Sequence, residues 1–194
     1  MAEPKRCWSS GDPLYVAYHD EEWGRPVLEE RGLLERICLE GFQSGLSWLT
    51  ILRKRDNFRT AFAGFDPERV ARFGERDVTR LLGDAGIIRH RGKIEAAIAN
   101  ARGTLALREA GRPLNELVWE HRPQRHRAPR SPRDWTATSQ ESVALSKTLK
   151  RAGFRFVGPT TVYAAMQACG VVNDHLAGCI VRRDVEAAIA NALR

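Results

Sequence analysis

The sequence predicts a mainly α-helical protein. Apolar residues recur at helical spacing, whereas strict alternation of apolar and polar residues over several positions is scarce. After Arg91, apolar residues at helical offsets mark one buried face: Ile94, Ala97, Ile98, Ala101 and Leu105. Asp66 followed by Pro67 is typical of a helix start, so we expect a short helix there that runs through Val70 and Phe73.

The chain is long enough for one hydrophobic core. It has 194 residues, of which 43% are hydrophobic, and we expect residues 1–194 to form a single domain or two closely packed helical lobes. Glycine is unfavourable inside a helix, so we expect helices to break at Gly92, Gly103 and Gly170.

Basic residues outnumber acidic ones. The chain contains 31 Lys and Arg against 24 Asp and Glu, which gives a net charge of +7 and favours a polyanionic partner over an acidic small molecule. No apolar run is long enough for a membrane span or a secretory signal. The 4 cysteines are too few and too scattered for a disulfide framework, which indicates reduced thiols or metal ligands and a cytoplasmic protein.

Aromatic residues are concentrated in the first quarter of the chain: Trp8, Tyr15, Tyr18, Trp23, Phe42 and Trp48. Such a cluster forms either hydrophobic core or a pocket that stacks a flat base. Glu40 follows an apolar helical pattern and precedes the turn-like Gly41 and Gly45. A carboxylate among aromatic walls is suited to accept hydrogen bonds from the amino group of adenine. A partly exposed glutamate at a helix end is the alternative.

Two pairs of candidate metal ligands lie at opposite ends of the chain. Cys7 and His19 form one pair, and His175 and Cys179, four positions apart, would share one face of a helix. Two Cys and two His suit tetrahedral zinc, and a complete set of protein ligands leaves no position for an activated water. The ion would therefore be a structural clip between the termini. The alternative is a buried thiol and two surface histidines without a metal.

The segment from Glu141 to Gly170 has the pattern of two helices joined by a glycine-bounded turn over residues 152–158. The free N–H groups and positive dipole end of the second helix, which opens at Pro159, suit a DNA phosphate. We expect residues 139–170 to form a DNA-binding hairpin through Lys147, Arg155, Gly158 and Thr160. A purely structural helical hairpin is the alternative.

The segment from His121 to Arg133 interleaves arginines with prolines and is therefore not a regular helix. Its arginines are Arg122, Arg125, Arg127, Arg130 and Arg133. We expect an exposed loop with two interpretations open, namely a phosphate contact near DNA and a charge-rich mobile loop without a fixed partner.

Five stretches in this order resemble the 3-methyladenine DNA glycosylase I family, within the helix-hairpin-helix DNA glycosylase superfamily. They are DPLYVAYHDEEWG from Asp12, ICLEGFQSGLSW from Ile37, DAGIIRHRGKI from Asp84, LSKTLKRAGFRFVG from Leu145 and MQACGVVNDH from Met166. The resemblance spans most of the chain. It implies a helical glycosylase fold with a structural zinc clip that joins the N- and C-terminal segments through Cys7, His19, His175 and Cys179.

The resemblance also implies the site and its activity. Glu40 would recognise the extruded base and act in catalysis, with stacking walls from Trp8, Tyr15, Tyr18, Trp23 and Trp48. The implied protein is a monomeric bacterial enzyme that flips N3-methyladenine out of alkylated double-stranded DNA and hydrolyses its bond to the sugar. We expect no strand cleavage because no lysine stands out as a nucleophile, and we expect Lys93 to contact solvent or phosphate. A non-catalytic DNA-binding module and a zinc hydrolase of small molecules are the alternatives.

The chain departs from the family pattern in two places. Trp8 follows Cys7 directly, without the family's usual glycine, so we expect the loop from Cys7 to Tyr15 to be reshaped. In the wider superfamily an Asp-x-His segment after the hairpin supplies a catalytic aspartate, and Asn173 occupies that position here.

Overall fold

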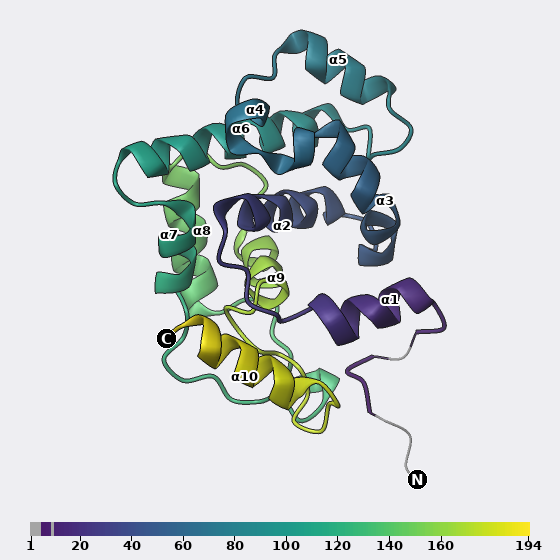
Figure 1. The fold of residues 1–194 in the computed structure, drawn as a ribbon, viewed down its shortest axis with the longest axis vertical. Coiled ribbons are helices and arrows are strands. Elements are labelled where there is room, and N and C mark those ends of the chain that lie inside the picture. Colours follow the sequence, from purple (N-terminus) through teal and green to yellow (C-terminus); the bar gives the residue numbers. More distant parts are fainter. Residues whose placement is uncertain (1–4, 9) are drawn as a thin grey trace.

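The computed structural model describes residues 5–8 and 10–194, and all regular secondary structure in these residues is helical, which confirms the predicted fold class (Figure 1). Residues 1–4 and 9 of the expected domain lie outside the described residues. The α-helices are α1 Pro13–Ala17, α2 Glu30–Gln43, α3 Trp48–Ala61, α4 Pro67–Val70, α5 Glu75–Gly83, α6 Arg91–Glu109, α7 Leu114–Glu120, α8 Gln140–Arg151, α9 Pro159–Ala168 and α10 Arg182–Ala192. A π-helical turn, Tyr18–Glu22, continues α1, and short 3-10 helices occupy Ala63–Phe65 and Pro132–Asp134.

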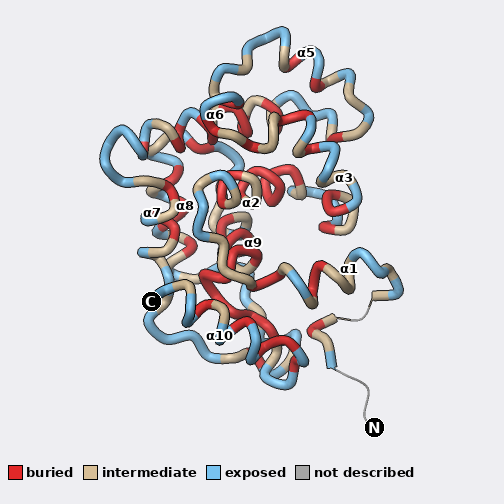
Figure 2. The backbone as a smooth tube through the Cα atoms, viewed as in Figure 1, coloured by how far each residue is buried: buried red, intermediate tan, exposed pale blue. Residues whose placement is uncertain are grey.

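Helix α2 lies at the centre of the molecule. It packs against α3, α6, α7 and α9, and its residues Leu33, Leu34 and Leu39 have no exposed surface. Figure 2 shows buried residues concentrated in α2 and α9, whereas the segment between α7 and α8 is largely exposed. Segments near the two ends of the chain meet where the Ile180 N–H donates to the Lys5 carbonyl oxygen at 3.1 Å. No helix among the described residues has the length and apolar character that a membrane crossing requires.

Local capping explains where α4 begins. The Asp66 carboxylate accepts hydrogen bonds from the N–H groups of Glu68 and Arg69, with Pro67 in the first helical position, as predicted. The helix ends at Val70, short of the expected Phe73. The N–H groups of Arg72 and Phe73 instead bond to carbonyls three residues back, which closes a turn.

Two of the three predicted glycine breaks are wrong, because Gly92 and Gly103 lie inside α6. At Gly103, a Cβ atom would meet the Ala152 carbonyl oxygen and the Phe154 ring, both at 2.7 Å. Glycine therefore allows the turn after α8 to approach α6 closely, which no local propensity reveals. Gly170 does end α9, as predicted, with a φ of +75° that favours glycine.

Candidate functional site

The expected aromatic residues converge around α1 and the π-helical turn. Asp12 caps α1 by accepting a hydrogen bond from the Leu14 N–H at 2.9 Å, and Pro13 occupies the first helical position. Ring centroids lie 5.3 Å apart for Trp8 and Tyr15, and 4.8 Å apart for Trp8 and Trp23. We call Trp8, Tyr15, Tyr18, Trp23 and Trp48 the aromatic cluster.

The cluster continues through Tyr18 to the start of α3. The rings of Tyr15 and Tyr18 lie 6.4 Å apart, and those of Tyr18 and Trp48 lie 5.3 Å apart. Trp8 and Tyr15 are half-buried, whereas the other three rings are buried, so the cluster has one side near solvent. Phe42 does not belong to it, because its ring packs 4.6 Å from that of Phe58 in the core.

Glu40 lies in the last turn of α2 and is only 7% exposed. Burial raises the pKa of its carboxyl to about 8, and the positive charge of Arg36 offsets this only in part. The Glu40 charge contributes to the raised pKa values of Tyr15 and Tyr18, for which burial is the larger cause. Glu40 therefore lies beside the aromatic cluster.

Three polar groups of this region lack a hydrogen-bond partner in the described part of the chain. The buried Trp48 indole N–H and the Nη1 group of Arg36 have no acceptor, and no described side chain or backbone N–H donates to the Glu40 carboxyl. Buried polar groups in folded proteins are nearly always paired, so such exceptions call for a functional explanation. A carboxyl acceptor and an indole donor beside flat rings are suited to bind a planar polar ligand.

Lys93 stabilises the end of α2 that carries Glu40. Its ammonium group donates to the carbonyl oxygens of Phe42 at 2.9 Å and Ser44 at 2.6 Å, and its side chain is buried. The expectation that Lys93 contacts solvent or phosphate was wrong. A cation at the carboxyl end of a helix satisfies free carbonyls and the helix dipole.

The four candidate metal ligands, Cys7, His19, His175 and Cys179, are buried and have their ligand atoms within 4.8 Å of one another. The Nδ1 of His175 lies 3.3 Å from the Cys7 sulfur and 3.4 Å from the Cys179 sulfur. The Nε2 of His19 lies 3.5 Å from the Cys179 sulfur. We call these residues the Cys/His cluster.

The outer nitrogens of both histidines have partners. Nδ1 of His19 lies 2.7 Å from the Asp20 carboxylate, and Nε2 of His175 lies 2.8 Å from the Trp23 carbonyl oxygen. Donation to these oxygens makes the inner nitrogens acceptors, which is how metal-binding histidines are held. The inner nitrogen of His19 accepts from the Cys7 backbone N–H at 3.2 Å. The clusters are in contact, since the Trp8 and His19 rings lie 4.6 Å apart.

His175 and Cys179 converge without the helix that their spacing suggested. The Cys179 N–H donates to the Leu176 carbonyl oxygen at 2.8 Å in a turn, and the Asn173 side chain accepts from the His175 N–H at 3.2 Å. Asn173 thus supports a candidate metal ligand. It also lines a 460 Å³ pocket with residues of α10, and none of the aromatic cluster lines that pocket.

The predicted hairpin residues lie on α8, in the turn that follows it and at the start of α9. The side chains of Lys147, Arg155 and Thr160 are exposed, and Gly158 is the N-cap of α9. The Arg155 N–H donates to the Asn100 side chain at 2.7 Å, which ties the turn to α6. Phe156, which sequence reasoning missed, is 40% exposed with a φ of +54°, and its Cβ would lie 3.3 Å from a Cβ added at Gly41.

Two acidic residues were also missed. Asp20 orients His19, and its position next to a candidate ligand was the available sign in the sequence. Asp174 is buried and accepts hydrogen bonds from Tyr163 at 2.8 Å and Gln167 at 2.7 Å. Burial acts to raise the pKa of Asp174, but His126 and these donors outweigh it and lower the pKa. Nothing in the sequence pattern indicated that role.

Comparison with known proteins gives a consistent result. The model of the methyladenine glycosylase family matches residues 8–183. DNA-3-methyladenine glycosylase 1 of Escherichia coli (strain K12) is 55% identical over 179 residues, covering 90% of this chain and 95% of that protein. DNA-3-methyladenine glycosylase of Haemophilus influenzae is 43% identical over 178 residues, covering 90% and 96%. A solved structure of 3-methyladenine DNA glycosylase I from Staphylococcus aureus, described as the structural basis of 3-methyladenine recognition, has a TM-score of 0.87 at 34% identity, covering 91% and 95%.

Proposed function

The chain belongs to the methyladenine glycosylase family, and from this we propose that it excises N3-methyladenine from alkylated double-stranded DNA. The observation that carries the proposal is the buried Glu40 carboxyl, which has no donor among the described residues and lies beside the aromatic cluster. An adenine edge supplies the missing donor through its exocyclic amino group. The names of the relatives, which specify 3-methyladenine, support the same substrate.

Each wall of the proposed pocket has a role in binding the extruded base. Flipping a nucleotide out of the duplex costs a few kcal/mol, and stacking offsets about 1–3 kcal/mol of this for each aromatic contact. Methylation at N3 gives the base a positive charge, which adds cation–π attraction to the faces of Tyr15 and Trp48 and a charge interaction with ionised Glu40. Neutral adenine lacks both gains, so the pocket selects the damaged base.

The mechanism needs little acid catalysis. The cationic base leaves as a neutral molecule, so no side chain has to protonate it, and cleavage proceeds through an oxocarbenium-like sugar that water attacks. Glu40 orients the base while the glycosidic bond breaks. Asn173, at the position of the superfamily aspartate, is engaged with the His175 N–H and is not required as a base.

We infer that the reaction stops at base release, without cleavage of the DNA strand. A strand-cleaving glycosylase needs a free amine nucleophile that attacks the sugar carbon. The buried Lys93 ammonium is held by two carbonyl oxygens. A covalent DNA adduct trapped by borohydride would contradict this inference.

We propose that the Cys/His cluster binds a structural zinc ion. Two thiols and two imidazoles match the ligands of closed tetrahedral zinc sites, and the partners of both outer nitrogens match those of bound histidines. Burial raises the pKa of the Cys7 thiol, so a nearby cation is what would stabilise its thiolate form. The ion would hold the two ends of the chain together, and no step of the reaction passes through it.

We propose that residues 139–170 bind the backbone of the duplex near the lesion. The N–H groups at the start of α9, together with Lys147, Arg155, Gly158 and Thr160, would bind a phosphate. One copy of the chain contains every residue of this site and of the base pocket, which supports action as a single domain and a monomer.

The test is release of free base from alkylated duplex DNA. We compare the native chain with Glu40→Gln and with Glu29→Gln, which changes an exposed glutamate just before α2. The native chain and the Glu29→Gln control should release 3-methyladenine at equal rates, and Glu40→Gln should release it much more slowly. If the native chain binds the DNA and releases no base, the protein is the non-catalytic module instead.

A further inference from the structure

The loop of residues 121–133, here the arginine loop, gathers five arginines in one short segment. Some arginines elsewhere meet carboxylates, as Arg108 of α6 does with Glu30 at 2.8 Å and Glu68 at 3.1 Å, whereas others, such as Arg69 and Arg72, form no ion pair with a described residue. All five arginines of the loop are exposed, and none forms an ion pair with a described residue. The neighbouring Asp134 carboxylate is engaged by the backbone N–H groups of Arg130 and Ser131, both at 2.8 Å.

The backbone of the arginine loop is anchored to the segment that follows α9. The Ala177 N–H donates to the Pro129 carbonyl oxygen at 2.8 Å, and His126 lies 2.7 Å from the Asp174 carboxylate. Beyond the loop, the Trp135 indole N–H donates to the Asp174 carbonyl oxygen at 2.9 Å. These contacts argue against a mobile loop without a fixed partner. Because these contacts already order the loop, a ligand that binds it loses little free energy to ordering the backbone.

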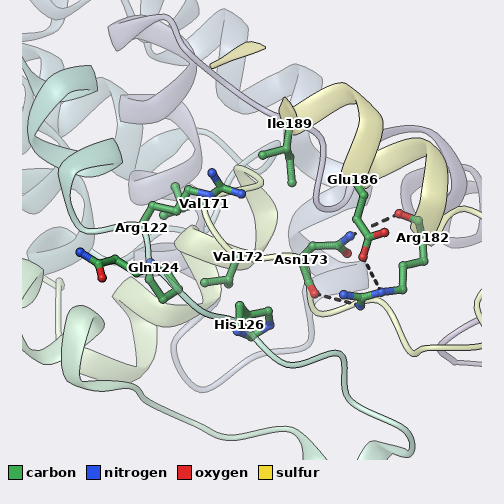
Figure 3. A pocket seen from close by; sticks show the side chains of 10 residues that line it. Arg122, Gln124, His126, Val171, Val172, Asn173, Arg182, Glu186 and Ile189 are labelled. Carbon is green, nitrogen blue, oxygen red and sulfur yellow. Dashed lines mark hydrogen bonds and ion pairs between the residues drawn. The ribbon is translucent and has the colours of Figure 1, made fainter. Parts of the chain in front are cut away.

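Three adjoining pockets follow the arginine loop. The largest, of 460 Å³, lies between Arg122, Gln124 and His126 on one side and α10 on the other (Figure 3). A second pocket, of 330 Å³, shares Pro123 and His126 with the first. A third, of 400 Å³, shares Arg127, Pro129 and Asp134 with the second. Because neighbouring pockets share lining residues, we call the three together the furrow.

The shape and charge of the furrow indicate an extended ligand. Four arginines line it at intervals, Arg122, Arg125, Arg127 and Arg130, over nine residues of chain that span roughly 30 Å at most. Carboxylates line it too, but Glu186 pairs with Arg182, Asp174 lies against His126 and Asp134 accepts from backbone N–H groups, which leaves Glu141 as the carboxylate without such a partner among the described residues. A compact anion would engage one or two of these side chains and leave the others unpaired. A row of phosphates engages them all, because each guanidinium pairs well with phosphate oxygens.

We propose that the arginine loop is a second contact surface for the DNA backbone, distinct from the hairpin. The inference rests on the proposed function only in taking duplex DNA as the polyanion. Helix α8 joins the two surfaces, and its 12 residues are about 18 Å long, which is the rise of about five base pairs. The hairpin therefore holds the phosphates near the lesion, and the arginine loop holds flanking phosphates that carry no damage.

The test compares two triple variants with the same loss of charge. One is Arg122→Gln, Arg125→Gln and Arg127→Gln in the arginine loop. The matched control is Arg69→Gln, Arg72→Gln and Arg76→Gln, which changes exposed arginines of the α4–α5 region that also form no ion pair with a described residue. Affinity for an undamaged duplex of 20 base pairs is measured by fluorescence anisotropy between 50 and 300 mM salt.

We expect the loop variant to bind about tenfold or more weakly at 0.1 M salt, with the slope of log K against log salt shallower by about 2 to 3. The control should keep both the native slope and the native affinity. An unchanged slope in the loop variant overturns the proposal, and so does an equal change in both variants, since that would reflect net charge alone.

Single-turnover excision at saturating enzyme separates this proposal from the proposed function. The loop variant should release 3-methyladenine at the native rate once the substrate is bound, because the loop contacts neither base nor sugar. A slower saturated rate overturns the role as a flanking contact. If even the native chain releases no base, the proposed function fails, whereas the salt dependence still decides whether the arginine loop binds DNA.

Discussion

The aromatic cluster and the Cys/His cluster are in contact, yet they differ in whether their polar groups have hydrogen-bond partners. Both outer nitrogens of the Cys/His cluster have partners, on Asp20 and on the Trp23 carbonyl. Beside the aromatic cluster, the Glu40 carboxyl and the Trp48 N–H have none among the described residues. A network of paired polar groups stabilises a fold. Unpaired buried polar groups lower the stability of the fold and are suited to bind a ligand. We expect this difference to separate structural residues from those that bind substrate.

The largest effect expected from this contrast is on stability, through the Cys/His cluster. Cys179→Ser removes one ligand of the proposed ion, so we expect a loss of at least about 4 kcal/mol of unfolding free energy, or roughly 10 °C in Tm. Calorimetry and measurement of bound zinc check this. Cys38→Ala, which changes a buried thiol outside the cluster, should keep the zinc. A Cys179→Ser protein with the native Tm and no zinc would contradict the stabilising role of the Cys/His cluster.

In contrast to Cys179→Ser, Glu40→Gln should slow excision and leave the stability of the fold unchanged. A hydrogen bond to a charged group contributes about 1.5–3 kcal/mol, so we expect excision to slow by roughly 10- to 150-fold. Single-turnover release of 3-methyladenine gives the rate, and binding to an undamaged duplex should remain native. Loss of Tm comparable to that of Cys179→Ser would place Glu40 among the structural residues.

Trp48→Ala should have a somewhat smaller effect on excision. Loss of one stacking surface costs about 1–3 kcal/mol, or roughly 5- to 150-fold in rate, and Trp48→Phe should retain most of the activity because it keeps a ring. Rates are compared well below the Tm of each variant, since Trp48 is buried. Native excision by both Trp48→Ala and Glu40→Gln would remove the pocket assignment.

The smallest expected effect is a dependence of excision on pH. Because the pKa of Glu40 is raised to about 8, the free protein must lose a proton to present the carboxylate, so the rate should fall as the pH is lowered through that value, by no more than the loss caused by Glu40→Gln. The groups around Glu40 are Tyr15, Tyr18, Arg36 and Cys169. A pH–rate profile between 6 and 9 checks this, and Glu40→Gln should give a flat one.

The raised pKa of Glu40 also makes the stability of the fold depend on pH. A glutamate with a raised pKa stabilises the fold below its ordinary value of 4.5, and that contribution is lost as the pH rises through about 8. Glu40→Gln should therefore have a higher Tm than the native chain at pH 9 and a similar one at pH 5. A native Tm above that of the variant at pH 9 would show that the carboxylate is well paired.

The helices and the members of the Cys/His cluster were largely predictable, whereas the roles of individual residues were less so. Asp66 and Pro67 marked a helix start because capping depends on neighbours in sequence. The role of Lys93 at the end of α2 was missed, because its two carbonyl partners lie 51 and 49 positions away. Phe42 was grouped with the wrong aromatics, since ring spacing in sequence does not show which rings face the core.

By itself, the sequence determined the helical class, the start of α4 and the basic balance, because periodicity, capping and composition are local or additive. Its resemblance to a known family implied the four residues of the Cys/His cluster. Only the tertiary structure decided that Gly103 belongs inside a helix, that His175 and Cys179 meet through a turn, and that the Glu40 carboxyl has no donor in the described residues. It also decided which arginines have a carboxylate within reach. Pairing and burial depend on residues that folding brings together from distant positions, and no pattern along the chain contains that information.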